Sequence, residues 1–376
     1  MSLHLIDFIK KNSNWHKTLQ EKPFCINIKE NNDYYLFKYN QIESDFHNEI
    51  VRECRGIILR KRDFSIACFK FKKFGNYGES YSDKINFSTA RVQQKIDGSL
   101  IGLFYDLGQW RLCTNGMIDA FEANGAMDKS FGQLFLEAWR NISNYDFYDF
   151  CNTYLNKHYT YMFELVHPLT RVVVRYEKPD IYHIGTRDND TLEEVNIDIG
   201  VQKPKEYSFN SLEDVIAMAQ TLPYSEEGYV VVDNNWNRVK IKSPSYVAIH
   251  HIKNNGVVTY KRIMELVMKN ESEEFLQYFP EFTEYFNKAE NAYGIFLERV
   301  KNDLKEIENK EFTTRKDYAM VVTKMACPDF MFKLYDKKYT PDQFRDYLFS
   351  NGAERVAKIL KLTDEKDESK KTLIEN

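Results

Sequence analysis

The sequence lacks the features of a secreted, membrane-bound or zinc-finger protein. Its six cysteines are scattered and form no C-x-x-C pair, which fits reduced thiols in a cytoplasm and argues against a disulfide framework or a zinc site. No run of eighteen apolar residues occurs, and Met1–Lys11 has too short an apolar run for a signal peptide. We therefore expect a soluble, cytoplasmic protein with no membrane partner.

No single sign of charge dominates the sequence either. The formal net charge is −4 and the isoelectric point is about 6.1, so any contact with nucleic acid must come from a local basic patch. With 376 residues, 43% of them hydrophobic and 15% aromatic, the chain is long enough for two domains and too rich in aromatic residues for a disordered protein.

From about Cys25 to Tyr246 the chain reads as short β segments separated by polar turns. The clearest segments are Tyr34–Tyr39, Gly56–Leu59, Leu100–Tyr105, Val172–Tyr176 and Tyr229–Val232. A short helix is expected near Leu3–Ile9, another at Ser130–Trp139, and a third after Ser211, where Ser-Leu-Glu-Asp resembles a capping box.

Helical periodicity replaces the strand signals after about His250. The expected helices are Tyr260–Met268, Glu284–Glu308, Lys316–Met325 and Pro341–Leu360. The polar stretch Lys253–Gly256 is a domain boundary in this interpretation, and the charged Thr363–Asn376 segment is expected to fray. The sequence thus predicts an α+β domain over residues 1–250, followed by a small all-helical domain over residues 251–376.

Lys95 opens the segment Lys95-Ile96-Asp97-Gly98-Ser99, which lies between two β segments. A lysine placed before a turn that glycine permits can project its amine into a cleft, and a deprotonated amine attacks phosphorus or carbonyl centres. The K-x-D-G pattern is weak by itself, since it occurs by chance in about one chain of this size in ten. An ordinary Asp-Gly hairpin turn on the surface is the alternative.

Lys240 and Lys242 lie two residues apart in the run Asn237-Arg238-Val239-Lys240-Ile241-Lys242. On a strand, alternation places both lysines on one face, with their ammonium groups about 7 Å apart. Such a pair favours an anion between the two charges, and a phosphate is the obvious one. The alternative is a solvated strand face, which runs of charge commonly form.

Two acids stand in apolar surroundings. Glu164 lies within Tyr161–Val166, and Glu227 directly precedes Gly228–Val232. A carboxylate that enters a buried strand costs free energy unless it is paired or binds a metal, and magnesium combines such oxygen ligands with phosphates. A solvent-facing acid at a strand end is the alternative for either residue.

Two cations upstream, Arg55 in Arg52-Glu53-Cys54-Arg55-Gly56 and Lys73 in Phe71-Lys72-Lys73-Phe74, lie beside β or turn segments. Both side chains suit phosphate oxygens, although a structural role is the more common one for either residue alone.

These segments follow one another in the order of a known family. The sequence resembles the lysyl-adenylate nucleotidyltransferase superfamily of ligases and capping enzymes, and within it the tRNA-repair RNA ligases of the phage T4 type. The segments that match the family motifs are Tyr39-Asn40, Glu53–Gly56, Lys73-Phe74, Lys95–Ser99, Phe163-Glu164, Glu227–Val230 and Lys240–Lys242. They run in family order from about residue 34 to residue 250.

The resemblance implies a nucleotidyltransferase domain built on antiparallel sheets and an ATP-dependent RNA ligase reaction. Lys95 would attack the α-phosphorus of ATP, AMP would pass to an RNA 5′-phosphate, and an RNA 3′-hydroxyl would displace the AMP. The implied catalytic residues are Lys95, Lys240, Lys242, Glu227 and Glu164. The implied nucleotide-binding residues are Tyr39, Arg55, Lys73, Lys95, Ile96, Asp97, Gly98, Glu164, Lys240 and Lys242. Mg²⁺, with Mn²⁺ as the alternative, would be held by Glu227, Glu164 and Asp97.

The resemblance also implies partners. The substrate would be RNA with 3′-hydroxyl and 5′-phosphate ends, with cleaved tRNA as the example that the family offers, and a monomer would suffice. The helical domain would serve as an RNA-specificity module, in which Glu273 would contact a metal-bound water.

The sequence departs from the family pattern at Asn115, where the T4-type enzymes carry a lysine. Either Arg111 or another cation would take over that phosphate contact, or the contact would be weaker. Ile184–Arg187 matches the intermediate motif only loosely. Three rivals stay open: a GTP-using capping enzyme, a DNA ligase and a catalytically silent nucleotide- or RNA-binding protein. The first two carry a C-terminal OB-fold, which predicts β hairpins where this sequence indicates helices.

Overall fold

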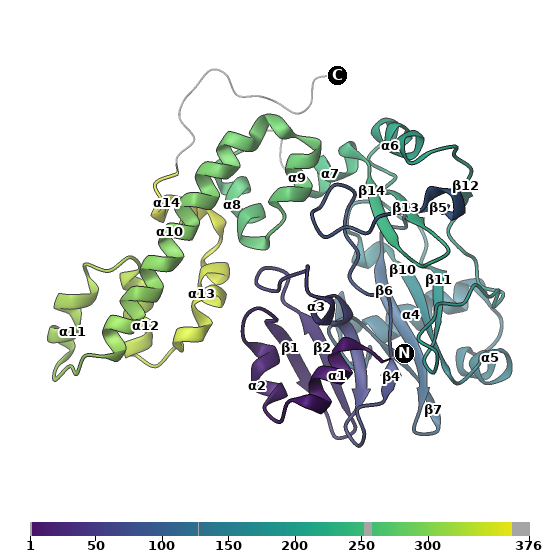
Figure 1. Cartoon of the computed structure of the whole chain (residues 1–376), viewed down its shortest axis with the longest axis horizontal. Coiled ribbons are helices and arrows are strands. Elements are labelled where there is room, and N and C mark those ends of the chain that lie inside the picture. The colour runs from purple at the N-terminus through teal and green to yellow at the C-terminus, as the bar shows by residue number, and fades with distance from the viewer. Residues whose placement is uncertain (1, 127, 252–257, 363–376) are drawn as a thin grey trace. The chain divides into compact units, whose positions relative to one another are not determined.

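The computed structural model describes residues 2–126, 128–251 and 258–362 (Figure 1). The chain forms two compact units, Met1–His250 and His251–Asn376. The boundary expected at Lys253–Gly256 and the tail expected at Thr363–Asn376 lie outside the described residues.

In the described residues of the first unit the sheets of four strands number three, and every pair of neighbouring strands in them is antiparallel, as the fold prediction requires. The first sheet has the order β1 (Ile26–Glu30), β2 (Tyr34–Tyr39), β3 (Arg55–Arg60) and β4 (Ile66–Cys68). The second has the order β11 (Asp180–Asp188), β10 (Tyr159–Val166), β6 (Ser99–Asp106) and β7 (Gln109–Cys113). The third has the order β12 (Glu206–Tyr207), β5 (Arg91–Gln94), β13 (Gly228–Val232) and β14 (Arg238–Lys242). A small ribbon joins β8 (Asn124–Ala126) to β9 (Lys129–Ser130).

Short helices surround these sheets (Figure 1). The α-helices are α1 (His4–Lys11), α2 (Trp15–Gln20), α3 (Glu49–Glu53), α4 (Phe131–Ile142), α5 (Phe147–Tyr154), α6 (Leu212–Thr221) and α7 (Pro244–His251), and the 3₁₀ turns are η1 (Phe87–Thr89) and η2 (Pro168–Thr170). The cap expected at Ser211 is confirmed, since its hydroxyl accepts from the Asp214 N–H. The helix expected at Ser130–Trp139 is also present as α4, and Ser130 caps it in a reciprocal capping box with Gln133.

Side chains alternate along β10, so that one face of this strand packs against α4. Tyr161, Phe163 and Leu165 are buried in one cluster with the inner side of α4, which contributes Leu134 and Phe135. Glu164 lies on the opposite face of β10, away from this apolar cluster.

The strand expected at Val172–Tyr176 is wrong, since this segment forms bends. The backbone N–H groups of Val173 and Val174 donate to the Asp97 carboxylate at 2.9 and 2.7 Å, so a side chain takes the donors that a β ladder would use. The other four expected strands coincide with β2, β3, β6 and β13.

Within residues 258–362, every regular element of the second unit is helical. The elements are α8 (Tyr260–Lys269), α9 (Ser272–Tyr278), η3 (Pro280–Phe282), α10 (Thr283–Glu308), α11 (Arg315–Val322), α12 (Pro328–Tyr335), η4 (Pro341–Gln343), α13 (Phe344–Asn351) and α14 (Ala353–Ile359). The single helix expected over Pro341–Leu360 is therefore interrupted, and the break between α13 and α14 falls at Gly352.

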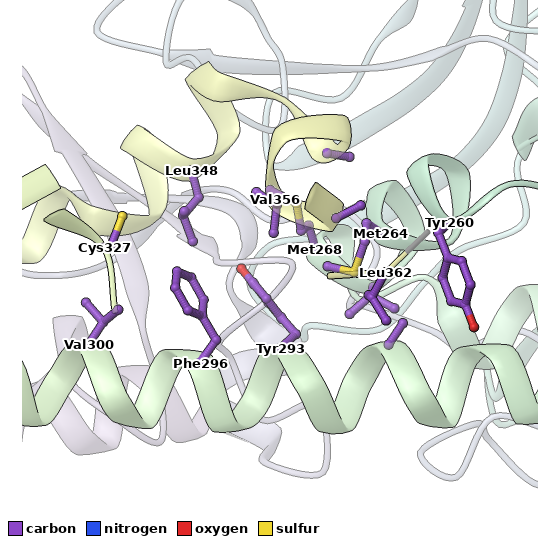
Figure 2. Packing of buried hydrophobic residues seen from close by; sticks show 14 of the residues in the cluster. Tyr260, Met264, Met268, Tyr293, Phe296, Val300, Cys327, Leu348, Val356 and Leu362 are labelled. Atoms are coloured by element: carbon purple, nitrogen blue, oxygen red, sulfur yellow. The ribbon is translucent and has the colours of Figure 1, made fainter. Parts of the chain in front are cut away.

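A continuous apolar cluster holds these helices together (Figure 2). Tyr293, Phe296 and Val300 recur along one side of α10 and meet Met264 of α8 and Val356 of α14 in that cluster. The spacing of three and four residues is that of one helical face, so the periodicity seen in the sequence is the core of this unit. Among the described residues, no helix combines the length and the apolar character needed to cross a membrane.

Candidate active site

A cavity of about 340 Å³ in the first unit collects side chains from all three sheets. Of the residues that the resemblance assigned to catalysis, nucleotide binding and metal binding in the first unit, all except Asp97 line this cavity. Those residues are Tyr39, Arg55, Lys73, Lys95, Ile96, Gly98, Glu164, Glu227, Lys240 and Lys242. Segments as far apart in the chain as Tyr39 and Lys242 thus converge on one polar recess.

Lys95 lies where the chain crosses from the third sheet to the second, because β5 belongs to one sheet and β6 to the other. The Asp-Gly hairpin alternative is therefore excluded. The backbone N–H of Lys95 donates to the Gly228 carbonyl at 2.8 Å, which ties the segment to β13. Its Nζ donates to Oε2 of Glu227 at 2.7 Å, so the amine has a fixed direction.

Glu227 is the acid that joins the proposed nucleophile to the lysine pair. Its side chain is only 5% exposed, and its Oε1 lies 3.8 Å from Nζ of Lys242. A carboxylate this deeply buried needs such cationic partners to remain charged.

The lysines of β14 alternate as the sequence predicted. Lys240 and Lys242 line the cavity, whereas Val239 and Ile241 are buried in the apolar cluster behind the sheet. The side chain of Lys242 is 11% exposed, which excludes the solvated-face alternative for this residue. Two cations on one wall of a recess make a suitable site for a phosphate.

Glu164 brings a second carboxylate to the cavity from β10. Burial raises the pKa of Glu164 to about 7; the charge of Lys95 opposes this shift and the charge of Glu227 adds to it. An acid that titrates near neutrality in a polar recess is typical of a functional site.

Asp97 has a different environment from the other predicted residues. Its Oδ2 accepts from the N–H groups of Val173 and Val174, and its Oδ1 accepts from the Tyr246 hydroxyl at 2.8 Å. The carboxylate therefore anchors the Lys95 segment to two distant parts of the unit. A metal contact for Asp97 stays a prediction.

Gly98 allows β10 to lie close to the Lys95 segment. A Cβ atom at this position would lie 2.4 Å from the carbonyl oxygen of Leu165 on β10, closer than any side chain can be placed. The glycine of the K-x-D-G pattern therefore lets β10, and Glu164 with it, pack against the Lys95 segment.

Arg55 and Asn115 present unused hydrogen-bonding atoms at the cavity wall. Nη1 of Arg55 and Oδ1 of Asn115 are buried and have no hydrogen-bond partner among the described residues. An orphaned guanidinium donor suits a phosphate oxygen. Arg111, expected as a substitute cation, does not line the cavity; its guanidinium lies 5.6 Å from the centre of the Tyr34 ring.

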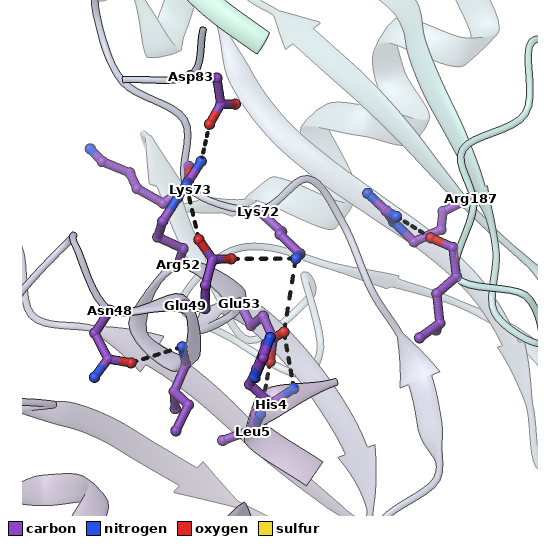
Figure 3. A network of polar contacts seen from close by, with 12 residues as sticks. His4, Leu5, Asn48, Glu49, Arg52, Glu53, Lys72, Lys73, Asp83 and Arg187 are labelled. Carbon is purple, nitrogen blue, oxygen red and sulfur yellow. Dashed lines mark hydrogen bonds and ion pairs between the residues drawn. The ribbon is translucent and has the colours of Figure 1, made fainter. Parts of the chain in front are cut away.

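Lys73 reaches the cavity from an aromatic surround. Its Nζ lies 4.7 Å from the ring centre of Phe46 and 5.5 Å from that of Tyr39. Arg52 fixes the adjacent backbone, because its Nε donates to the Lys73 carbonyl while its guanidinium pairs with Glu49 and Asp83 (Figure 3).

Glu53, which matched an upstream family element, supports the fold. It is 1% exposed and accepts from the N–H groups of His4 and Leu5 at 3.1 and 2.8 Å (Figure 3). The carboxylate thus satisfies free donors at the start of α1.

Arg238 is a cavity residue that the sequence reading missed. It lies 6% exposed at the start of β14, and both of its terminal nitrogens donate to Glu194, which also pairs with Arg187. Alternation from Lys240 and Lys242 could have placed Arg238 on the same face. The loosely matched Ile184–Arg187 segment is divided, with Ile184 at the cavity and Arg187 in this buried ion network.

The two cavity carboxylates fit a divalent cation that arrives with phosphates. No group of three or more histidine, cysteine or acidic ligands occurs in the described parts of the chain, so a complete protein cage is not formed there. Mg²⁺ commonly uses only one or two carboxylates together with phosphate oxygens and water. Glu227 and Glu164 meet that requirement.

Comparison with known proteins gives a consistent result. A family model described as RNA ligase matches residues 53–246, more than half of the chain. An RNA ligase of Rhodothermus phage RM378 is 28% identical over an alignment that covers 78% of this chain and 83% of the phage protein. A protein of Autographa californica nuclear polyhedrosis virus, named as a candidate bifunctional polynucleotide kinase/RNA ligase, is 31% identical over 74% of this chain. The match covers only 42% of the length of that viral protein.

Solved structures of Naegleria gruberi RNA ligase also match. A mutant with ATP and Mn has a TM-score of 0.33 at 14% identity, over 43% of this chain and 51% of that one, and a mutant with AMP and Mn has a TM-score of 0.35. Values this low carry no argument about this chain. The family model, in contrast, matches more than half of the sequence. The chain belongs to the RNA ligase family of the phage T4 type.

Proposed function

We propose that this chain is an ATP-dependent RNA ligase in which Lys95 carries AMP and transfers it to the 5′-phosphate end of an RNA. Membership of the RNA ligase family supports the reaction class. The observation that carries the residue assignment is the meeting of Lys95, Glu227 and Lys242 in one cavity. Nucleotidyl transfer is mainly a matter of positioning and charge neutralisation, and this cluster supplies both.

In the first step, Nζ of Lys95 attacks the α-phosphorus of ATP and pyrophosphate leaves. Glu227 holds one N–H of that amine at 2.7 Å and so directs it along the cavity wall. Lys240 and Lys242 neutralise the charge that develops on the α-phosphate. AMP then passes to the RNA 5′-phosphate and is displaced by the RNA 3′-hydroxyl, so the same two cations serve all three steps.

The remaining cavity residues bind the nucleotide in this proposal. Arg55 and Lys73 take phosphate oxygens, Tyr39 lies beside them, and Ile96 and Gly98 form the wall next to the nucleophile. Glu227 and Glu164 hold Mg²⁺ or Mn²⁺, which supplies positive charge to the phosphates when bound.

The identity of the RNA is a finer question. Ends with a 3′-hydroxyl and a 5′-phosphate, closure of a cleaved tRNA, action as a monomer and a cytoplasmic location are parts of the proposal. Residues 1–250 would form the adenylyltransferase domain, and residues 251–376 would select the RNA. Glu273, exposed in the first turn of α9, is the acid proposed to act there.

Parallel joining of defined RNAs tests this proposal. A single strand, a bridged nick and a cleaved tRNA with 3′-hydroxyl and 5′-phosphate ends should each be offered with ATP and Mg²⁺, and then with Mn²⁺. We expect ATP-dependent joining of at least one RNA and none of matched DNA ends. Failure to join any of the three RNAs, or equal joining of DNA, would contradict the proposal.

A capping-type nucleotidyltransferase is the second candidate, because it shares the lysine chemistry. The helices over residues 258–362 favour the ligase, since a capping enzyme carries β hairpins of an OB-fold in that position. Adduct formation with labelled ATP and with labelled GTP separates the two candidates, and an adduct with neither nucleotide would indicate a catalytically silent protein.

A further inference from the structure

Two cysteines and a lysine that the proposed reaction does not use meet behind the cavity wall. Sγ of Cys68, on β4, lies 3.6 Å from Sγ of Cys113, at the end of β7, so the pair bridges the first and second sheets. Nζ of Lys70 lies 3.5 Å from the Cys113 sulfur. The three side chains are buried, with exposed fractions of 1% or less.

Gly102 of β6 makes room for this cluster. A Cβ atom on Gly102 would lie 2.8 Å from Sγ of Cys113, 2.9 Å from Cδ of Lys70 and 3.3 Å from Sγ of Cys68. The three side chains therefore fill the space that the missing side chain leaves. Since protein interiors are close-packed, the two sulfurs are held in contact and do not drift apart.

The cluster also has an unusual charge balance. Among the described residues, Lys70 donates to the carbonyls of Gly56 and Thr114 at 2.6 and 3.3 Å and to Cys113, and its hydrogen-bond partners include no carboxylate. A buried ammonium group requires an anion nearby. Burial raises the pKa of Cys113, but the Cys68 thiol and Lys70 together lower it to about 6, whereas burial and Cys113 raise the pKa of Cys68. Cys113, which accepts from Lys70, is therefore the sulfur of the pair that the nearby charge favours as a thiolate.

We propose that Cys68 and Cys113 form a site of covalent modification, at which a peroxide converts the two sulfurs into a disulfide. The Cys113 thiolate attacks one peroxide oxygen and breaks the O–O bond, which gives a sulfenic acid and a hydroxide that takes up a proton to become water. The Cys68 sulfur then attacks the Cys113 sulfur, and its proton leaves with the hydroxyl group as a second water. The two sulfurs lose two electrons in total, and the peroxide gains them.

The disulfide changes the cavity wall through its effect on Lys70. A disulfide is about 2.05 Å long, so the sulfurs must approach each other by about 1.5 Å, and the thiolate that balances Lys70 disappears. The two carbonyls that Lys70 holds belong to Gly56 and Thr114, the chain neighbours of Arg55 and Asn115. The disulfide thus disturbs the two wall residues whose polar atoms are unpartnered, a consequence that rests on the proposed function.

Peptide mapping of the full-length protein tests the site. Reduced protein is treated with hydrogen peroxide, free thiols are blocked, and peptides are mapped without reductant. We expect a Cys68–Cys113 linked peptide, lighter by two hydrogens than the free pair and lost on treatment with dithiothreitol. In the same samples, formation of the labelled adduct with ATP should fall by about tenfold or more, because misplacement of an active-site group by 1 Å can cost about a hundredfold, and dithiothreitol should restore it.

Two variants control the assignment. Cys68→Ser should give no such linked peptide, whereas Cys151→Ser, which removes a buried cysteine outside the cluster, should still give it. Wild-type protein that forms no Cys68–Cys113 link under peroxide, or that forms the link with unchanged adduct formation, would overturn the proposal. Absence of an adduct in the reduced protein would instead refute the proposed function, and the mapping would still report on the cysteine pair.

Discussion

The carboxylate of Glu227 holds Nζ of Lys95 at 2.7 Å, and the same carboxylate lies 3.8 Å from Nζ of Lys242. Glu227→Gln keeps the shape of the side chain but removes the charge between the two ammonium groups. We expect adduct formation with α-labelled ATP to fall by about a hundredfold or more, a loss typical of removing one preorganised charge from an active site. Glu213→Gln, at an exposed acid on α6, should have no effect. Near-wild-type labelling of the Glu227 variant would contradict its role.

The lysine pair gives a second prediction. Lys240→Ala and Lys242→Ala should each lose RNA joining, because each removes a cation from the wall that faces the phosphates. Gel-based joining of a 5′-labelled RNA measures the effect, and Lys84→Ala, at an exposed lysine outside the cavity, is the control. Normal joining by both strand variants would show that the pair does not act on the phosphates.

The raised pKa of Glu164 predicts that the stability of the folded protein depends on pH. Its pKa in the folded protein is about 7, against 4.5 as the ordinary value, so between those values the folded state binds a proton that the unfolded state has lost. Stability from this group is fully present below pH 4.5 and is lost as the pH rises to about 7, by about 3 kcal/mol in total.

Chemical denaturation of wild-type protein and of Glu164→Gln across this range measures the change. The difference in the free energy of unfolding should move in favour of the variant as the pH rises, and should be constant above pH 7.5 to 8, roughly one unit past the folded pKa. If the difference in the free energy of unfolding between the two proteins does not change with pH, the pKa of Glu164 is not raised in the folded protein.

Gly98 gives a prediction about packing. A methyl group there would meet the Leu165 carbonyl at 2.4 Å, and backbone cannot move aside cheaply. We expect Gly98→Ala to lower the free energy of unfolding by about 2–3 kcal/mol and to abolish adduct formation. Gly116→Ala is the matched control, because a Cβ atom there meets only the Lys38 side chain, at 3.5 Å. Equal stability of the two variants would contradict the close approach.

The predicted cavity residues came from the resemblance to the ligase family, and strand geometry gives a physical reason for part of that set. Strand alternation fixes the faces of Lys240 and Lys242, and an acid at the edge of an apolar strand, such as Glu227, must find a partner. The start of α6 was also predictable, because Ser211 acts through an N–H group three residues away.

Contacts between distant positions could not be predicted in this way. The partners of Asp97 lie 76 to 149 positions away, and these hydrogen bonds convert the expected strand Val172–Tyr176 into bends. The pairing of Arg238 with Glu194 spans 44 positions and likewise leaves no local pattern. In each case the tertiary fold brings the two partners together, and no spacing in the sequence indicates the contact.

Mapping of the covalent adduct tests the central claim most directly. The full-length protein is incubated with α-labelled ATP and Mg²⁺, digested, and searched for a lysine that carries AMP. The account predicts a single modified peptide, with AMP on Lys95, and no label on Lys95→Ala. Label on another residue, or label retained by Lys95→Ala, would contradict it.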